Sequence, residues 1–109
     1  MNFIRAADTS ELAENQMKSI KLEGREILLV NLAGSFYAIA NKCTHLGGSL
    51  AKGSLHGSAV RCPNHGAMFD VTTGVVVGEA KIGFIKMKVA NEPSFPVKIV
   101  GTDILVGFP

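Results

Sequence analysis

The chain has 109 residues and a formal net charge of +2, with 47% hydrophobic and 18% charged residues. This length and composition are those of one folded domain and exclude an intrinsically disordered chain. The small charge and the lack of a Lys/Arg run exclude a nucleic-acid-binding protein. No run approaches the ~18 apolar residues of a membrane span, and the N-terminus lacks the layout of a secretory signal. We therefore expect a cytoplasmic protein without membrane contact, in which cysteine thiols stay reduced.

The N-terminal part of the chain predicts one helical turn followed by three strands. Residues 8–15 have capping-box spacing, with Asp8 three positions before Glu11. Apolar runs and alternations then predict strands, separated by two-residue turns at Glu23-Gly24 and Ala33-Gly34. These strands are expected at 17–22, 25–32 and 35–40.

The C-terminal part predicts three further strands, at 84–90, 96–100 and 103–108, with a turn at Gly101-Thr102 between the last two. No other segment has helical periodicity over a useful length. Short strands joined by glycine turns predict an antiparallel all-β domain, a small sandwich or barrel. We expect residues 1–109 to form this single domain.

Residues 41 to about 80 separate the two sets of strands and contain two glycine-rich loops. Between the loops, residues 50–60 predict a short hairpin that turns at His56-Gly57. The β base then consists of residues 1–40 and 81–109. Because large apolar residues are few in the inserted part, we expect it to lack a core of its own and to need a metal centre as a crosslink.

The two loops contain the only two cysteines of the chain and two of its three histidines. The pattern is Cys43-x-His45, sixteen residues, and then Cys62-x-x-His65. Each loop therefore offers one thiolate and one imidazole. A mononuclear zinc site accepts such ligands, and a redox-active disulfide or a chance arrangement are further alternatives. A [2Fe–2S] cluster with two cysteines on one iron and two histidines on the other also fits the pattern.

The sequences CTHLGG at 43–48 and CPNHG at 62–66 resemble the two cluster-binding loops of Rieske proteins, and the similarity extends over about residues 35–77. The resemblance implies a Rieske-like β base with a small inserted cluster-binding subdomain and one [2Fe–2S] cluster per chain. It implies that Cys43 and Cys62 bind one iron and that His45 and His65 bind the other. The resemblance also implies that Gly47, Gly48 and Gly66 bring backbone N–H groups close to the cluster sulfurs. It implies that the Leu46 side chain shields the cluster from solvent and that Pro63 restricts the conformation of the second loop.

Two departures separate the chain from the respiratory-chain branch of that family. Gly48 and Asn64 stand where that branch has an additional cysteine in each loop, so a disulfide between the loops is impossible here. Ala67 and Phe69 stand where it has hydroxyl side chains that donate to the cluster, which implies a lower reduction potential. Both departures point to the soluble ferredoxin branch. Residues 75–84 also lack the proline usual in the loop that covers the cluster.

The resemblance implies a one-electron carrier, not itself an enzyme, that passes electrons from a reductase to a terminal oxygenase. Ile27 to Phe69 contains no Asp or Glu, which argues against a hydrolytic base or a carboxylate iron ligand at the site. Lys42, Lys52 and Arg61 lie in this stretch, so we expect a positive cluster end and a partner with an acidic docking surface. We expect a monomer. The alternatives are an accessory subunit similar to the small subunit of nitrite reductases, and a zinc-stabilised structural domain.

Overall fold

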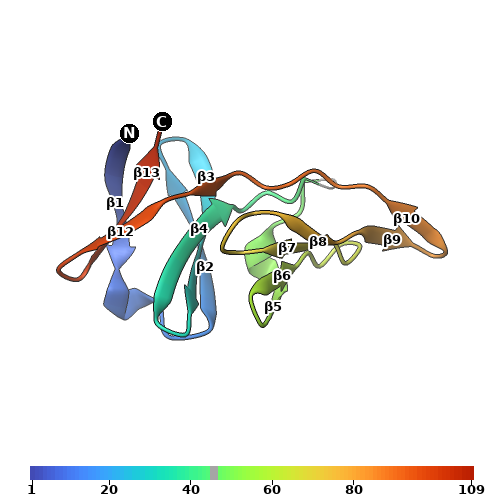
Figure 1. Ribbon diagram of the computed structural model, residues 1–109, viewed down its shortest axis with the longest axis horizontal. Helices are drawn as coiled ribbons and strands as arrows, with labels where there is room; N and C mark the ends of the chain where they lie inside the picture. The colour runs from blue at the N-terminus through green and yellow to red at the C-terminus, as the bar shows by residue number, and fades with distance from the viewer. Residues whose placement is uncertain (45–46) are drawn as a thin grey trace.

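Antiparallel strands are the main secondary structure of the computed structural model, which describes residues 1–44 and 47–109 (Figure 1). Within these residues, strands form four sheets in an elongated molecule of 48 × 27 × 18 Å. The strands are β1 (Asn2–Asp8), β2 (Gln16–Leu22), β3 (Arg25–Leu32), β4 (Ser35–Ala40), β5 (Ser54–His56), β6 (Ala59–Arg61), β7 (Met68–Asp70), β8 (Val76–Gly78), β9 (Ala80–Ile82), β10 (Ile85–Met87), β11 (Ser94–Phe95), β12 (Val97–Val100) and β13 (Asp103–Phe108). Two short 3-10 helices, η1 (Thr9–Glu11) and η2 (Leu50–Lys52), complete the elements.

The base consists of two sheets with the strand orders β1-β13-β12 and β11-β4-β3-β2. Both termini lie at this end of the molecule, because β1 pairs with β13 (Figure 1). Buried apolar side chains from both sheets, with Leu12 after η1, form one core, which contains Ala7, Leu12, Ile27, Leu29, Ala38, Ile104, Val106 and Phe108. The predicted antiparallel all-β fold is confirmed.

Strand β3 is buried on both of its faces. Successive side chains of a strand point to opposite faces of the sheet, so Ile27 and Leu29 belong to the base core while Leu28 and Val30 point the other way. All four are 0% exposed. The second face of β3 is therefore one wall of a second core.

The second core joins the base to the inserted sheet, whose strand order is β5-β6-β7-β8. It contains Leu28, Val30 and Ile39 from the base, and Cys43, Leu50, Val60, Cys62, Ala67, Phe69, Val71 and Ala80 from the inserted part. The inserted part therefore has no separate core, as expected, but it packs against the base, so the expected need for a metal centre as the crosslink was wrong. Its few large apolar side chains suffice because β3 and β4 supply the opposite wall.

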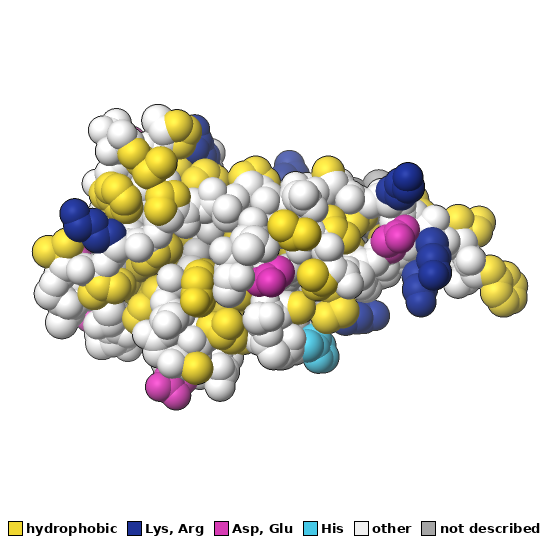
Figure 2. Space-filling view, viewed as in Figure 1, with side chains coloured by type: hydrophobic (Ala, Val, Ile, Leu, Met, Phe, Trp, Pro, Cys, Tyr) yellow, Lys and Arg dark blue, Asp and Glu magenta, His cyan; other side chains and the backbone are white. Residues whose placement is uncertain are grey.

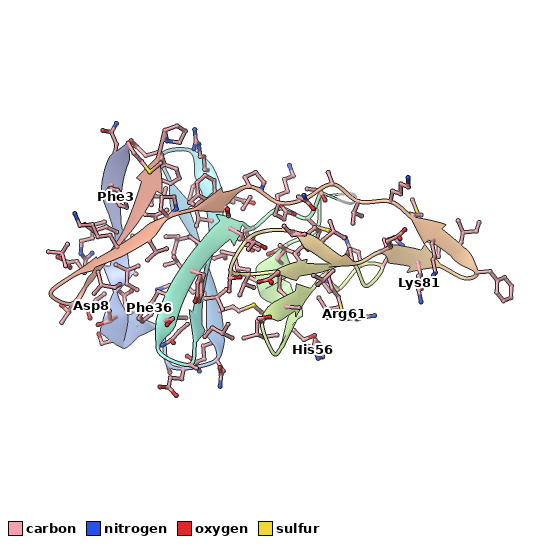
Figure 3. The ribbon with its side chains drawn as sticks, viewed as in Figure 1. Phe3, Asp8, Phe36, His56, Arg61 and Lys81 are labelled. Atoms are coloured by element: carbon pink, nitrogen blue, oxygen red, sulfur yellow. The ribbon has the colours of Figure 1, made fainter. Side chains whose placement is uncertain are left out.

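The predicted strands 25–32, 35–40 and 103–108 are confirmed at those bounds. The hairpin between the loops is also confirmed, and His56 stands at its tip, away from the loops (Figure 3). Strand β1 was not predicted, because its pairing partner lies at the far end of the chain and a register shift between Arg5 and Ala7 breaks its alternation.

The segment 84–90 forms a shorter strand than predicted. Only Ile85–Met87 pairs, and it pairs with β9, which was not predicted either. These two strands form a hairpin that projects from the end of the molecule opposite to the termini, where Figure 2 shows hydrophobic side chains at the tip beside Lys or Arg side chains. Between β10 and β11, Ala90 and Glu92 make hydrogen bonds with Thr44 of the first cysteine loop and with Gly74.

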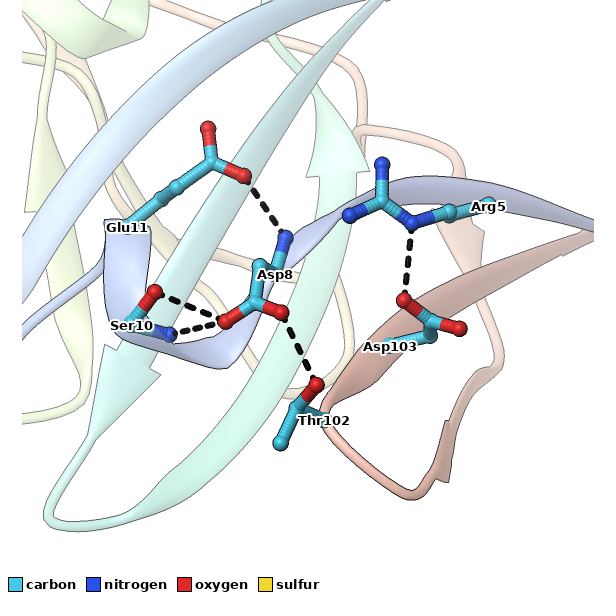
Figure 4. A network of polar contacts seen from close by, with 6 residues as sticks. All are labelled: Arg5, Asp8, Ser10, Glu11, Thr102 and Asp103. Atoms are coloured by element: carbon cyan, nitrogen blue, oxygen red, sulfur yellow. Dashed lines mark hydrogen bonds and ion pairs between the residues drawn. The ribbon is translucent and has the colours of Figure 1, made fainter.

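The predicted capping box closes a single 3-10 turn at η1 (Figure 4). The Asp8 N–H donates to Glu11 Oε2 at 2.7 Å, and Asp8 Oδ1 accepts the Ser10 N–H at 2.9 Å. Thr102 Oγ1 donates to Asp8 Oδ2 at 2.9 Å, which ties this turn to the β12–β13 hairpin. Hydrogen bonds to the ionised form hold the pKa of both carboxyls below their usual values.

Among the described residues, no helix is long and apolar enough to cross a membrane. The division of residues 1–109 into one domain with a cluster-binding part at about 41–80 stays a prediction.

Leu28→Ala and Leu29→Ala form a matched pair, because both side chains are fully buried in β3 and belong to different cores. Each change should lower the free energy of unfolding by ~2–5 kcal/mol. Leu28→Ala should speed amide exchange chiefly in β6 and β7, and Leu29→Ala chiefly in β1 and β13, because local opening follows the core that loses contacts. Hydrogen exchange with mass spectrometry checks this, and identical exchange patterns in the two variants would contradict the two-core description.

Candidate metal centre

The first cysteine loop is a hydrogen-bonded turn at the end of β4. The Cys43 N–H donates to the Gly48 carbonyl at 2.6 Å, and the Gly47 N–H donates back to the Cys43 carbonyl at 3.0 Å. Gly47 has a φ of 73°, which glycine adopts without strain. The loop therefore closes on itself around Cys43.

The second cysteine loop, at the end of β6, repeats this turn. The Cys62 N–H donates to the Ala67 carbonyl at 2.7 Å, and the Gly66 N–H donates back to the Cys62 carbonyl at 3.2 Å. Gly66 has a φ of 79°, close to that of Gly47. Each cysteine thus begins the same turn, with a left-handed glycine four residues later.

The two cysteines lie in the same buried cluster, with exposed fractions of 2% for Cys43 and 0% for Cys62. They are not joined in a disulfide. Ala67 and Phe69 belong to the same cluster, so at these positions the chain contributes apolar packing beside the cysteines. Two buried thiols at the starts of matched turns fit a group that is held by one thiolate from each loop.

Gly48 and Asn64 face each other across the two loops. A Cβ atom built at Gly48 would clash with the Asn64 side-chain amide nitrogen and lie 3.0 Å from its Cγ. These are the two positions that carry additional cysteines in the respiratory-chain branch. Their contact shows that the described parts of the two loops are in direct apposition without a covalent link.

The remaining predicted site residues differ in how much is described. His65 is half-buried and Pro63 is exposed. His45 and Leu46 lie outside the described residues. Within residues 1–44 and 47–109, no three His, Cys, Asp or Glu side chains form a group that could hold a metal ion. The predicted set of four ligands includes His45 and therefore stays a prediction.

Asn41 supports the first loop from inside the protein, and sequence reasoning missed it. This side chain is 3% exposed; its Nδ2 donates to Ser49 Oγ at 3.0 Å, and its Oδ1 accepts the Ala51 N–H at 2.9 Å. The Asn41 carbonyl also accepts the Leu50 N–H at 2.9 Å. The position of Asn41, a polar residue just before the first cysteine loop, was the feature of the sequence that could have indicated this role.

A carboxylate reaches the first loop from a distant part of the chain. Glu92 is 4% exposed, and its Oε2 accepts the Thr44 N–H at 2.9 Å. Burial raises the pKa of Glu92 to about 7, against the opposite effect of the Thr44 N–H. The expectation of a site without carboxylates holds for Ile27 to Phe69, but it was wrong for the site as a whole.

Residues 90–93 bind this loop and a neighbouring turn together. Thr44 Oγ1 donates to the Ala90 carbonyl at 2.7 Å, and the Glu92 N–H donates to the Gly74 carbonyl at 2.8 Å. A Cβ atom at Gly74 would overlap the Glu92 carbonyl, so only glycine allows this approach. The 90–93 segment therefore links the first cysteine loop to the turn at Gly74.

The predicted cations do not gather at one place. Arg61 lines a groove with His65, whereas Lys52 lines a separate hollow beside β2. The structure adds Lys81 and Lys86, from β9 and β10, to the groove with Arg61. The mirrored sequence KIGFIK at 81–86 was the signal that could have predicted this hairpin.

Comparison with known proteins agrees with this geometry. The family model described as "Rieske [2Fe-2S] domain" matches residues 2–87. The ferredoxin component of the naphthalene 1,2-dioxygenase/salicylate 5-hydroxylase systems of Ralstonia sp is 32% identical over 105 residues, covering 96% of this chain and 94% of the relative. The solved ferredoxin of carbazole 1,9a-dioxygenase from Nocardioides aromaticivorans IC177 has a TM-score of 0.84 and 30% identity, covering 97% of each chain. Mouse apoptosis-inducing factor 3 is 44% identical over 64 residues, or 59% of this chain, which spans only 11% of that relative.

The chain therefore belongs to the Rieske [2Fe-2S] domain family, and its cofactor is a Rieske-type [2Fe–2S] cluster.

Glu92→Gln should alter how stability depends on pH. In the wild-type protein the pKa of Glu92 rises from 4.5 to about 7 on folding, so between these values the folded chain binds more protons than the unfolded chain. Stability then falls as the pH rises through this window, by at most about 1.4 kcal/mol per pH unit for one proton. The substituted amide keeps an oxygen for the Thr44 N–H but carries no charge, so the variant should lose this contribution and gain stability over wild type toward pH 8.

Urea unfolding at pH 5, 6, 7 and 8 checks this, with Glu79→Gln as a control that removes one exposed carboxylate. Parallel stability profiles of Glu92→Gln and wild type over the whole range would contradict the assigned role of the buried carboxyl.

Proposed function

We propose that the chain is a one-electron carrier whose cluster is held by Cys43 and Cys62 on one iron and by His45 and His65 on the other. The observation that carries this proposal is the pair of matched turns, which bring two buried cysteines from separate loops into one core cluster. Zinc sites of the same composition do not need this symmetry. The family match to the Rieske domain supports the diiron alternative over zinc.

When bound, the cluster supplies reversible one-electron chemistry, with potentials of ~−150 to +300 mV for this ligand type. The residues of the chain determine its surroundings. Ala67 and Phe69 exclude water beside the cysteines and offer no hydroxyl donor, which favours the lower part of that range. The Gly47 and Gly66 N–H groups donate to the carbonyls of Cys43 and Cys62, so these glycines shape the two turns. Pro63 stiffens the second loop. The cluster contacts implied for Gly48 and Leu46 stay predictions, and Leu46 lies outside the described residues.

The carrier role, rather than catalysis by this chain, is supported by how its nearby carboxylate is used. Glu92 is buried and turned onto the Thr44 N–H, so it does not line an open cavity as a base. The partners proposed are a reductase as donor and a terminal oxygenase as acceptor, by analogy with the ferredoxin components of dioxygenase systems that the chain resembles over nearly its whole length. The cytoplasmic location and the monomeric state stay predictions.

A second candidate is an accessory Rieske-fold part of a larger oxidoreductase. The similarity to apoptosis-inducing factor 3 favours it, because there the matching segment is a small part of a longer protein. The coverage of 94% and 97% in the two ferredoxins favours the independent carrier.

Anaerobic titration with dithionite tests the carrier role. The purified protein should contain iron and acid-labile sulfide, take up one electron per chain and return it on reoxidation with recovery of its visible spectrum. Its potential should lie toward the lower end of the ~−150 to +300 mV range. A colourless protein with stoichiometric zinc, or a cluster lost on the first reduction, would rule out the carrier.

A further inference from the structure

The β9–β10 hairpin exposes apolar side chains where no other described element covers them. Its two strands form a sheet with each other only, over three residue pairs. Phe84 is fully exposed, and Ile85 and Ile82 are 66% and 46% exposed. Three large apolar side chains within four residues form a contiguous tip, which differs from the singly scattered apolar residues of an ordinary surface.

The hairpin also sets like charges against each other. Lys81 and Lys86 are directly opposite across the two strands, and the neighbouring Ile82–Ile85 pair points to the other face of the hairpin. Like charges at directly opposed positions destabilise a strand pair, and an isolated two-stranded hairpin is marginal in water. An acidic group placed between the two lysines would remove this repulsion.

The base of the hairpin is anchored beside the candidate metal centre. The Lys81 N–H donates to the His65 carbonyl at 2.9 Å, and Ala80 is fully buried in the cluster that contains both cysteines. The tip therefore extends outward from the second cysteine loop, at the end of the molecule opposite to the termini (Figure 1).

A groove with an excess of positive charge lies between the second loop and the hairpin. Its charged lining residues are Arg61, Lys81 and Lys86 with the single carboxylate Glu79, and His65 lines the same groove. Arg61 and Lys81 come from different elements and lie toward the same end of the protein (Figure 3). The groove therefore complements carboxylates on a partner, directly next to an apolar tip.

We propose that the β9–β10 hairpin and this groove form the docking surface for an electron-transfer partner that presents an apolar depression bordered by Asp and Glu side chains. Phe84, at the exposed end of the hairpin, fills the depression, and the three cations meet the acidic border. This inference rests on the proposed carrier function, because that function makes the groove beside His65 the place where a redox partner gains most by binding.

The test uses the cluster-loaded protein on gold electrodes coated with carboxylate, mixed carboxylate and methyl, or amine monolayers. These coatings present the acidic and apolar groups of the proposed partner as defined probes. A quartz crystal microbalance measures adsorption, and voltammetry on the same electrode measures the redox signal. The wild-type protein should adsorb most tightly to the mixed coating.

Matched variants separate the hairpin from the base. Phe84→Ser should weaken adsorption to the mixed coating roughly tenfold, whereas Ile99→Ser, at an exposed apolar position in β12, should leave it unchanged. Lys86→Glu should weaken adsorption to both carboxylate-containing coatings, and Lys98→Glu in β12 should not. Equal effects of hairpin and base variants, or a preference for the amine coating, would overturn the proposal.

The redox signal distinguishes failure of this inference from failure of the carrier function. Adsorption that depends on Phe84 without a one-electron signal refutes the carrier and leaves the hairpin as a docking surface for a partner that is not an electron-transfer protein. A one-electron signal with adsorption independent of Phe84 refutes the docking surface and leaves the carrier function standing. Vesicles of phosphatidylcholine and phosphatidylglycerol complete the test, because Phe84-dependent co-sedimentation with them would assign the hairpin to a lipid surface and overturn a protein partner.

Discussion

The burial of β3 on both faces is the constraint on which the rest of the structure depends. One face closes the base against β13, and the other, through Leu28 and Val30, closes the core that contains both cysteines. A small glycine-rich insertion cannot bury enough apolar surface alone, so it uses a wall that the base already provides. The cysteine loops are consequently fixed relative to the base by packing, and the cluster is not required as the only crosslink.

The second cysteine loop also anchors the proposed docking hairpin, while the first is held by Asn41, which precedes it, and by Glu92 from far along the chain. The first loop is thus held by buried hydrogen bonds, whereas the hairpin beside the second loop extends into solvent. In place of a disulfide between the loops, the protein has contact between Gly48 and Asn64 and the hydrogen bonds of the 90–93 segment.

Much of this was predictable from local sequence. Strands β3, β4 and β13 were bounded correctly, because their apolar runs are flanked by glycine turns, and the two loops were found because cysteine and histidine are scarce. The features that the sequence did not predict are contacts between distant segments. The pairing of β1 with β13, the shared core behind Cys43 and Cys62, and the approach of Glu92 to Thr44 each join segments far apart in the chain. The hydrophobic pattern within either of the two contacting segments cannot predict such contacts.

The central claim is that one histidine from each loop binds the same iron, and pulsed EPR of the reduced protein tests it most directly. Two strongly coupled nitrogen nuclei should appear in the wild-type protein. His65→Ala should lose the paramagnetic centre or retain only one such nitrogen, whereas His56→Ala, which alters the third histidine at the exposed tip of β5, should retain both. A spectrum without histidine nitrogen coupling, or one that His65→Ala leaves unchanged, would contradict the account.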